Sequence, residues 1–153
     1  MLAELSRVMK PGASLASYEW CLTDRFDARR HDHRWLRHNI EVGFALPRLE
    51  RCHEIASALV EAGFEILERR DLADGAAQRA PWYRPLKGGI FSLSGLICSP
   101  AGRALAGVVN RVVDGKGEPA TDRWLGAGAD ALVAAGEKGI FTPMYFVHAR
   151  KPN

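Results

Sequence analysis

The chain has 153 residues, of which 47% are hydrophobic and 25% are charged. This length is enough for one domain whose core buries roughly two thirds of the surface that the unfolded chain exposes. The net charge of +3 comes from 21 basic and 18 acidic residues spread along the sequence, without a dense basic stretch. Composition therefore predicts one globular domain and argues against a nucleic acid as partner.

Cysteine usage and hydropathy predict the cellular setting. Cys21, Cys52 and Cys98 are far apart and odd in number, which is typical of reduced thiols and predicts no disulfide. No apolar run reaches the roughly 18 residues of a membrane-spanning helix, and the first residues lack the pattern of a signal peptide. We therefore expect a cytoplasmic protein with at most a peripheral contact with a membrane.

The first predicted elements are a helix and a strand. Leu2, Leu5 and Met9 recur at helical spacing, and Lys10-Pro11-Gly12 then ends the helix. Residues 13–20 begin at this Pro-Gly turn and carry aromatic side chains suited to a strand. Helix, tight turn and strand thus follow in that order.

The sequence YEWCLTD, residues 18–24, lies where this strand is predicted to run into a loop. It places aromatic and carboxylate side chains close together: Tyr18, Glu19, Trp20 and Asp24. Functional residues concentrate where rigid elements lead into loops. These side chains are therefore the first candidates for a site, although packing of the strand end explains each of them equally well.

A second helix and strand follow. Apolar residues recur at helical spacing up to Gly63, which is predicted to cap the helix, and residues 64–72 form the next strand. The predicted antiparallel partner of this strand is residues 144–149, about seventy positions further on. A structureless loop of that length is uncommon in a compact domain, so the intervening residues are predicted to fold.

The intervening segment is predicted to be helical. Its first part, residues 81–97, is rich in aromatic and aliphatic side chains and could cover a pocket, but core packing is the favoured role for most of them. One helix is predicted over residues 99–115. A second is predicted to begin near Thr121 and to stop at Gly136.

A charged stretch after Asp24 suggests a metal site but fits one poorly. Asp27, His31, Asp32 and His33 lie close in sequence. However, the two histidines at i and i+2 would share a face only in a strand, and the segment has the composition of a solvated loop or the start of a helix. We therefore expect no metal.

Five motifs together resemble the C-terminal half of sterol 24-C-methyltransferases, which belong to the S-adenosylmethionine-dependent methyltransferases. They keep that family's order and span nearly the whole chain. The motifs are RVMKPGASLASYEW (residues 7–20), YEWCLTDRFD (18–27), HRWLRHNIEVG (33–43), PWYRPLKG (81–88) and GIFTPMYFVHARKP (139–152).

The resemblance implies an α/β fold: the C-terminal half of a Rossmann-like methyltransferase sheet, with a helical insertion before the last antiparallel strand. Residues 1–74 and 140–153 would form the sheet part and residues 75–139 the insertion. The chain has no glycine-rich strand-to-helix loop followed some twenty positions later by an acidic residue. We therefore expect a fragment without the cofactor-binding half, inactive alone, whose open sheet edge pairs with that half or with a second copy.

The implied reaction transfers the methyl group of S-adenosyl-L-methionine to the side-chain double bond of a sterol or a related polyisoprenoid lipid. The carbocation that results shifts a hydride and loses a proton, so aromatic faces, carboxylates and a base are needed nearby. Predicted catalytic residues are Tyr18, Glu19, Asp24 and Glu41, with His33 a weaker candidate for the base. Predicted substrate contacts are Trp20, Trp82, Tyr83, Phe91, Phe141 and Tyr145.

One segment departs from the family. Where the family pattern resembles Ile-Glu-x-Gly-Asp-Gly-Ile-Pro, this chain has IEVGFALP, residues 40–47. Phe44 and Ala45 replace the second acid and the second glycine, so a role of that acid does not transfer to this chain. A non-catalytic lipid-binding or interaction module is the alternative function.

Overall fold

The structure, a computed structural model, describes residues 1–74, 80–87 and 119–153, and only the backbone of residues 119–125. The chain divides into two compact units. The first consists of residues 1–26, 49–78 and 141–153, and the second of residues 27–48 and 79–140. Residues 27–48, predicted to belong to the sheet part, cluster with the insertion.

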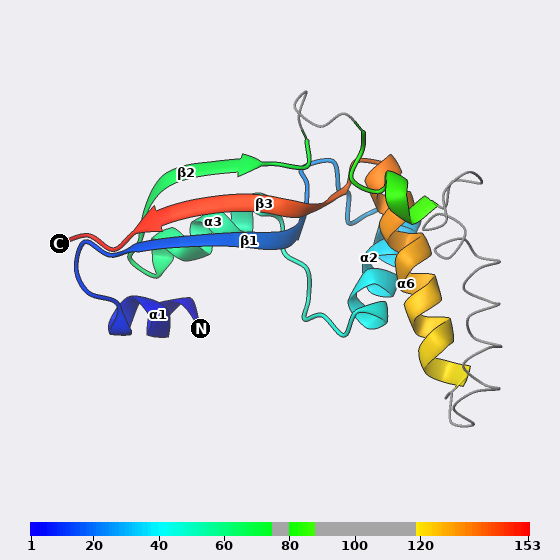
Figure 1. Cartoon of the computed structure of the whole chain (residues 1–153), viewed down its shortest axis with the longest axis horizontal. Helices are drawn as coiled ribbons and strands as arrows, with labels where there is room; N and C mark the ends of the chain where they lie inside the picture. Colours follow the sequence, from blue (N-terminus) through cyan, green and yellow to red (C-terminus); the bar gives the residue numbers. More distant parts are fainter. Residues whose placement is uncertain (75–79, 88–118) are drawn as a thin grey trace. The chain divides into compact units, whose positions relative to one another are not determined.

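The first unit contains a three-stranded sheet in the order β1-β3-β2. The strands are β1 (Ser14–Leu22), β2 (Glu65–Asp71) and β3 (Phe141–Arg150). β3 lies between the other two and is antiparallel to both (Figure 1). The α/β class and the predicted pairing of residues 64–72 with the last strand are confirmed.

β1 and β3 extend further than their sequence pattern indicated, whereas β2 is slightly shorter. β1 continues past Trp20 to Cys21 and Leu22, which are buried and lie opposite Thr142 and Phe141. Leu22 and Phe141 form an apolar cross-strand pair, which stabilises this end of the strand. The expected loop therefore begins two residues later than predicted.

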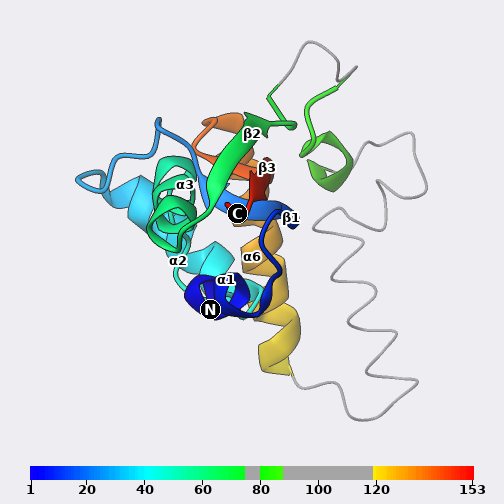
Figure 2. The same ribbon diagram turned by 90° about the vertical axis from the view of Figure 1, so that its left-hand side faces the viewer.

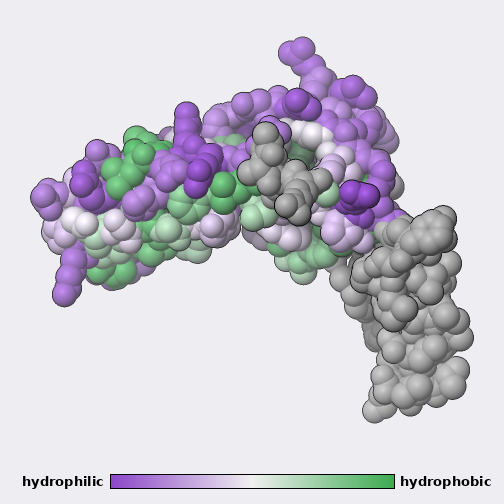
Figure 3. Space-filling model, turned by 45° about the horizontal axis from the view of Figure 1, so that its top comes forward, coloured by the Kyte–Doolittle hydropathy of each residue, from purple (hydrophilic) through white to green (hydrophobic). Residues whose placement is uncertain are grey.

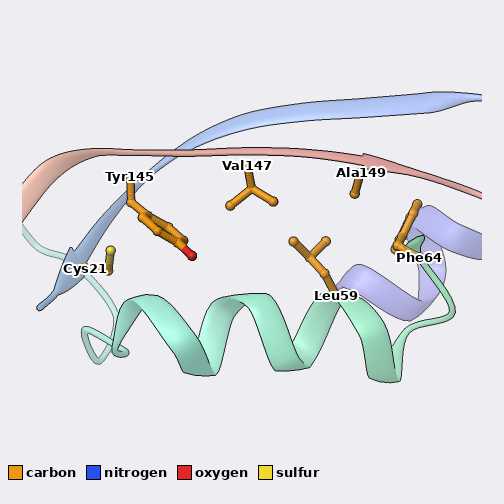
Figure 4. Close-up of a cluster of buried hydrophobic side chains, with 6 residues drawn as sticks. All are labelled: Cys21, Leu59, Phe64, Tyr145, Val147 and Ala149. Carbon is orange, nitrogen blue, oxygen red and sulfur yellow. The ribbon is translucent and has the colours of Figure 1, made fainter. Parts of the chain in front are cut away.

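Two helices pack on one face of this sheet: α1 (Leu2–Val8) and α3 (Cys52–Glu61). Figure 2 shows both helices on the same side of the three strands. Their apolar residues, including Leu5 and Ile55, contact a common core cluster. Figure 4 shows side chains of β3 pointing toward Leu59 of α3. The cluster consists of Cys21, Leu59, Phe64, Tyr145, Val147 and Ala149.

Residues near both ends of the sequence hold α1 in place. Gly12 has a φ of +77°, which glycine adopts without strain, and its amide donates a hydrogen bond to the carbonyl of Lys151 at 2.9 Å. The Lys151 ammonium group donates to the carbonyls of Ser6 and Met9 at 2.6 and 2.9 Å. It thereby satisfies two carbonyl groups that the end of α1 leaves without helical partners.

The second unit is helical and contains α2 (His31–Gly43), the 3₁₀ helix η1 (Arg84–Lys87) and α6 (Pro119–Glu137). A Cβ atom added to Gly128 of α6 would lie 3.0 Å from the Cα of Gly43, so two glycines allow α2 and α6 to approach closely. None of the helices in the described ranges is long and apolar enough to cross a membrane.

Of the predictions for this unit, one is confirmed, one is off by a single residue and one is not tested. The charged stretch runs as a loop to Arg30 and then begins α2 at His31, as its composition indicated. α6 does not stop at Gly136 but continues to Glu137, and the chain turns at Gly139, where φ is +65°. Gly136 serves packing instead, because a Cβ atom there would lie 2.8 Å from the Trp82 ring. The helix predicted over residues 99–115 lies outside the described residues.

The core cluster predicts a contrast between two neighbouring residues of α3. Leu59 is buried against β3, whereas Val60 is exposed. Leu59→Ala should lower the free energy of unfolding by about 2–5 kcal/mol, because it leaves a cavity. Val60→Ala should change it by less than about 0.5 kcal/mol. Urea titration of both variants measures the difference, and equal effects would contradict the packing described here.

Candidate functional site

The aromatic residues near the end of β1 lie on the sheet face opposite α3. The Tyr18 ring packs against Phe146 with centroids 5.3 Å apart, and the Trp20 ring makes an edge contact with Phe141 at 5.6 Å. Tyr18 remains 61% exposed and Trp20 38%. Figure 3 shows hydrophobic surface interspersed with hydrophilic surface on the unit that carries the strands. These two rings could therefore contact a ligand or a protein partner.

Glu19 lies on the other face of the same strand. It is half-buried and opposite Tyr145, whose side chain belongs to the core under α3. Burial raises the pKa of Tyr145 above its ordinary value. Because successive residues of a strand point to opposite faces, Glu19 does not converge with Tyr18 and Trp20.

Asp24 follows the strand and is exposed. Its Oδ1 atom lies 3.3 Å from Nδ1 of His53, which comes from the first turn of α3. The chain beside it is fixed by a hydrogen bond from the amide of Leu22 to the carbonyl of Glu50 at 2.9 Å. The Arg51 guanidinium lies 5.7 Å from the centre of the Phe26 ring. Asp24 therefore extends from a well-anchored junction between β1 and α3.

The remaining acid–base candidates lie in the second unit. Arg37 Nε donates a hydrogen bond to Glu41 Oε1 at 2.6 Å, and both side chains are 19% exposed. His33 is buried, and its Nδ1 accepts a hydrogen bond from the amide of Asp27 at 3.0 Å. A proton removed by His33 would therefore have to go to Nε2. The catalytic roles of both residues stay predictions.

The other aromatic residues predicted to contact the substrate are divided between the two units. Phe141 and Tyr145 are buried in the first unit. Trp82 and Tyr83 make an edge contact with ring centres 5.5 Å apart and pack against Gly136 of α6. Phe91 lies outside the described residues. The rings whose packing is described serve the cores of their units, and their contact with a substrate stays a prediction.

Three of the residues in the charged stretch, Asp27, Asp32 and His33, take part in ion pairs or hydrogen bonds. Asp32 lies 2.8 Å from Arg30 and 3.2 Å from Lys138. The hydrogen bond from Arg30, aided by Lys138, holds the pKa of Asp32 well below its ordinary range. In the part of the chain that the structure describes, no group of three or more His, Cys, Asp or Glu side chains could hold a metal ion.

Comparison with known proteins identifies the family. Residues 99–153 match the family model described as sterol methyltransferase C-terminal. The chain is 38% identical, over 97% of its length, to cycloartenol-C-24-methyltransferase of Arabidopsis thaliana, and 37% identical over 97% to sterol 24-C-methyltransferase of Kluyveromyces lactis. The chain matches the C-terminal part of sterol methyltransferases along almost its whole length. The resemblance that the sequence motifs carried is thereby confirmed.

The chain spans 45% and 43% of the length of these two sterol methyltransferases. Among solved structures, it resembles a protein assigned as a sarcosine dimethylglycine methyltransferase from Galdieria sulphuraria, with a TM-score of 0.57 and 17% identity. That likeness covers 99% of this chain and 46% of the other. At this level of identity, the likeness supports a methyltransferase fold and carries no information about the substrate.

Sequence reasoning did not predict two contacts within the first unit. Thr142, buried at the start of β3, donates a hydrogen bond from Oγ1 to Asp71 Oδ1 at 2.6 Å, which joins the ends of β2 and β3. The sulfur atoms of Cys21 and Cys52 lie 3.0 Å apart. No local pattern signals either contact. Both arise from pairing between elements far apart in sequence.

The departure from the family pattern in residues 40–47 has a structural consequence. Ala45 has a φ of +50°, which is uncommon for a residue with a Cβ atom. The sterol methyltransferase pattern has its second glycine at this position. The backbone thus keeps a conformation suited to glycine, although the side chain has changed.

Restoring glycine at this position should stabilise the protein. An alanine in the left-handed region costs about 1–2 kcal/mol, and the larger unfolded-state entropy of glycine offsets part of this. Ala45→Gly should therefore raise the free energy of unfolding by about 0.5–1 kcal/mol. Ala134→Gly, inside α6, should lower it by about 1 kcal/mol. Chemical denaturation measures both, and loss of stability in Ala45→Gly would refute the strain at this site.

Proposed function

We propose that these residues form part of an S-adenosylmethionine-dependent C-methyltransferase that methylates the side-chain double bond of a sterol. The observation that carries the proposal is the 38% identity to cycloartenol-C-24-methyltransferase along almost the whole chain. The 37% identity to a sterol 24-C-methyltransferase supports the same reaction. Peripheral attachment of a cytoplasmic enzyme to a membrane suits a substrate that dissolves poorly in water.

The proposal includes a cofactor-binding half that lies outside these 153 residues. Curated relatives are more than twice as long as the chain, and its sequence has no glycine-rich loop suited to binding a nucleoside. Apart from a bridge between Leu22 and Arg51, β1 pairs with β3 alone among the described strands. Unpaired strand edges recruit further strands, so this edge is the proposed docking place for the missing half.

Glu19 is the proposed group that stabilises the carbocation. Its carboxylate is half-buried, where charge acts more strongly than in water, and β1 and its register with Tyr145 fix its backbone. Tyr18 and Trp20 lie on the opposite face of the strand. They can contact a substrate but cannot share one side of the cation with Glu19. Asp24, beyond the strand end, stays a candidate for the final proton transfer.

Titration with the co-substrate tests the division into halves. Calorimetry on the 153-residue chain should show no binding of S-adenosylmethionine, whereas a fusion to the unmatched N-terminal remainder of the Arabidopsis thaliana relative should bind it and methylate cycloartenol. Micromolar affinity of the chain alone would contradict the missing half. A folded fusion that binds both compounds without turnover would contradict the proposed reaction and favour a lipid-binding module.

Substitution of Glu19 in that fusion tests its role. Glu19→Gln keeps the shape and removes the charge, so turnover should fall by about 100- to 1000-fold, or roughly 2.7–4 kcal/mol of transition-state stabilisation. Sterol affinity and melting temperature should change little. Glu68→Gln, an exposed acid on β2 paired with Arg70, is the matched control and should keep full turnover. A destabilised but fully active Glu19→Gln would remove Glu19 from the catalytic residues.

A further inference from the structure

Cys21 and Cys52 form a thiol pair that the proposed chemistry does not use. Cys21 is the penultimate residue of β1 and is fully buried, and Cys52 is the first residue of α3. Their sulfur atoms are 3.0 Å apart, although 31 positions separate them in sequence. The hydrogen bond from Leu22 to Glu50 and the parallel bridge between Leu22 and Arg51 hold the two elements together beside the sulfurs.

The two thiols have unequal surroundings. Cys52 is half-buried and lies at the N-terminus of a ten-residue helix, where backbone amides favour a thiolate. The hydrogen bond from Cys21 lowers the pKa of Cys52, against the opposing effects of burial and of the carboxylates of Asp71 and Asp24. That same hydrogen bond, together with burial, raises the pKa of Cys21. Cys52 is therefore the reactive thiol and Cys21 its protected neighbour.

We propose that Cys21 and Cys52 form a reversible disulfide when the protein meets hydrogen peroxide. The Cys52 thiolate attacks one peroxide oxygen, the O–O bond breaks, and the departing hydroxide takes up a proton to give water. The resulting sulfenic acid on Cys52 is attacked by the Cys21 sulfur as it loses its proton. An S–S bond forms, the S–O bond breaks, and a second water leaves. Two electrons pass from the two thiols to the peroxide.

The positions of the two sulfur atoms already favour this bond. A disulfide needs the sulfur atoms to approach by only about 1 Å from their present separation. The bond would tie the end of β1, two residues beyond Glu19, to the first turn of α3. It would thereby fix the end of β1, from which the loop with Asp24 extends, to α3. The inference rests on this geometry and not on the proposed methyl transfer.

Peroxide treatment of the folded chain tests the inference. A Cys98→Ser background leaves two thiols, so that only this pair can react. After exposure to hydrogen peroxide, both thiols should be lost to alkylation in denaturant, the intact mass should fall by about 2 Da, and a peptide should link Cys21 to Cys52. The melting temperature should rise by roughly 10 °C, because the bond closes a long loop in the unfolded chain. Dithiothreitol should reverse every change.

Two variants separate the roles of the thiols. Cys52→Ser, at a half-exposed position, should remove the peroxide response and leave Cys21 reduced. Cys21→Ser should instead leave a sulfenic acid on Cys52 that dimedone captures. Two results would overturn the proposal: over-oxidation of Cys52 with Cys21 still free in the parent, or equal disulfide formation in folded and urea-unfolded protein. If Cys21→Ser, which alters a buried residue, impairs folding, the Cys98→Ser protein and its Cys52→Ser variant still test the proposal.

Discussion

The first unit depends on the insertion of β3 between β1 and β2. Each outer strand hydrogen-bonds to β3, and the two do not contact each other as neighbours in the sheet. The same strand carries Tyr145, Val147 and Ala149 into the core against α3 (Figure 4). A short stretch near the end of the sequence thus supplies both the hydrogen bonds and much of the apolar surface that stabilise this unit.

This arrangement decides what the candidate site can be. Pairing with β3 fixes the register of β1, and the register places Tyr18 beside Phe146 and Glu19 beside Tyr145. The aromatic rings and the carboxylate, adjacent in sequence, are therefore separated by the thickness of the sheet. A ligand on one face of β1 can therefore contact the rings of Tyr18 and Trp20 or the carboxylate of Glu19, but not all three.

Sequence reasoning succeeded where the signal was local. Periodicity and turn residues located β1, α3, β2 and the antiparallel partner of β2 within a few residues, and the motifs identified the family. Strict alternation along β1 could also have separated Glu19 from Tyr18 before the structure was known. Contacts between distant elements were not accessible, because the distance between Cys21 and Cys52 depends on how α3 packs against the sheet. The end of α6 was located to within one residue, but the contact of Gly136 with Trp82 carried no local signal.

The order in which the chain is synthesised bears on the central strand. Ser14 and Glu65 both pair with Arg150, so the sheet cannot close until residues around position 150 have left the ribosome. Until then β1 and β2 have no strand between them, and the apolar face of α3 has no sheet to cover it. Contacts of such long sequence separation form slowly, because a large loop must close first. The nascent chain therefore passes through a stage in which its most apolar surfaces are exposed, and chaperones bind surfaces of this kind.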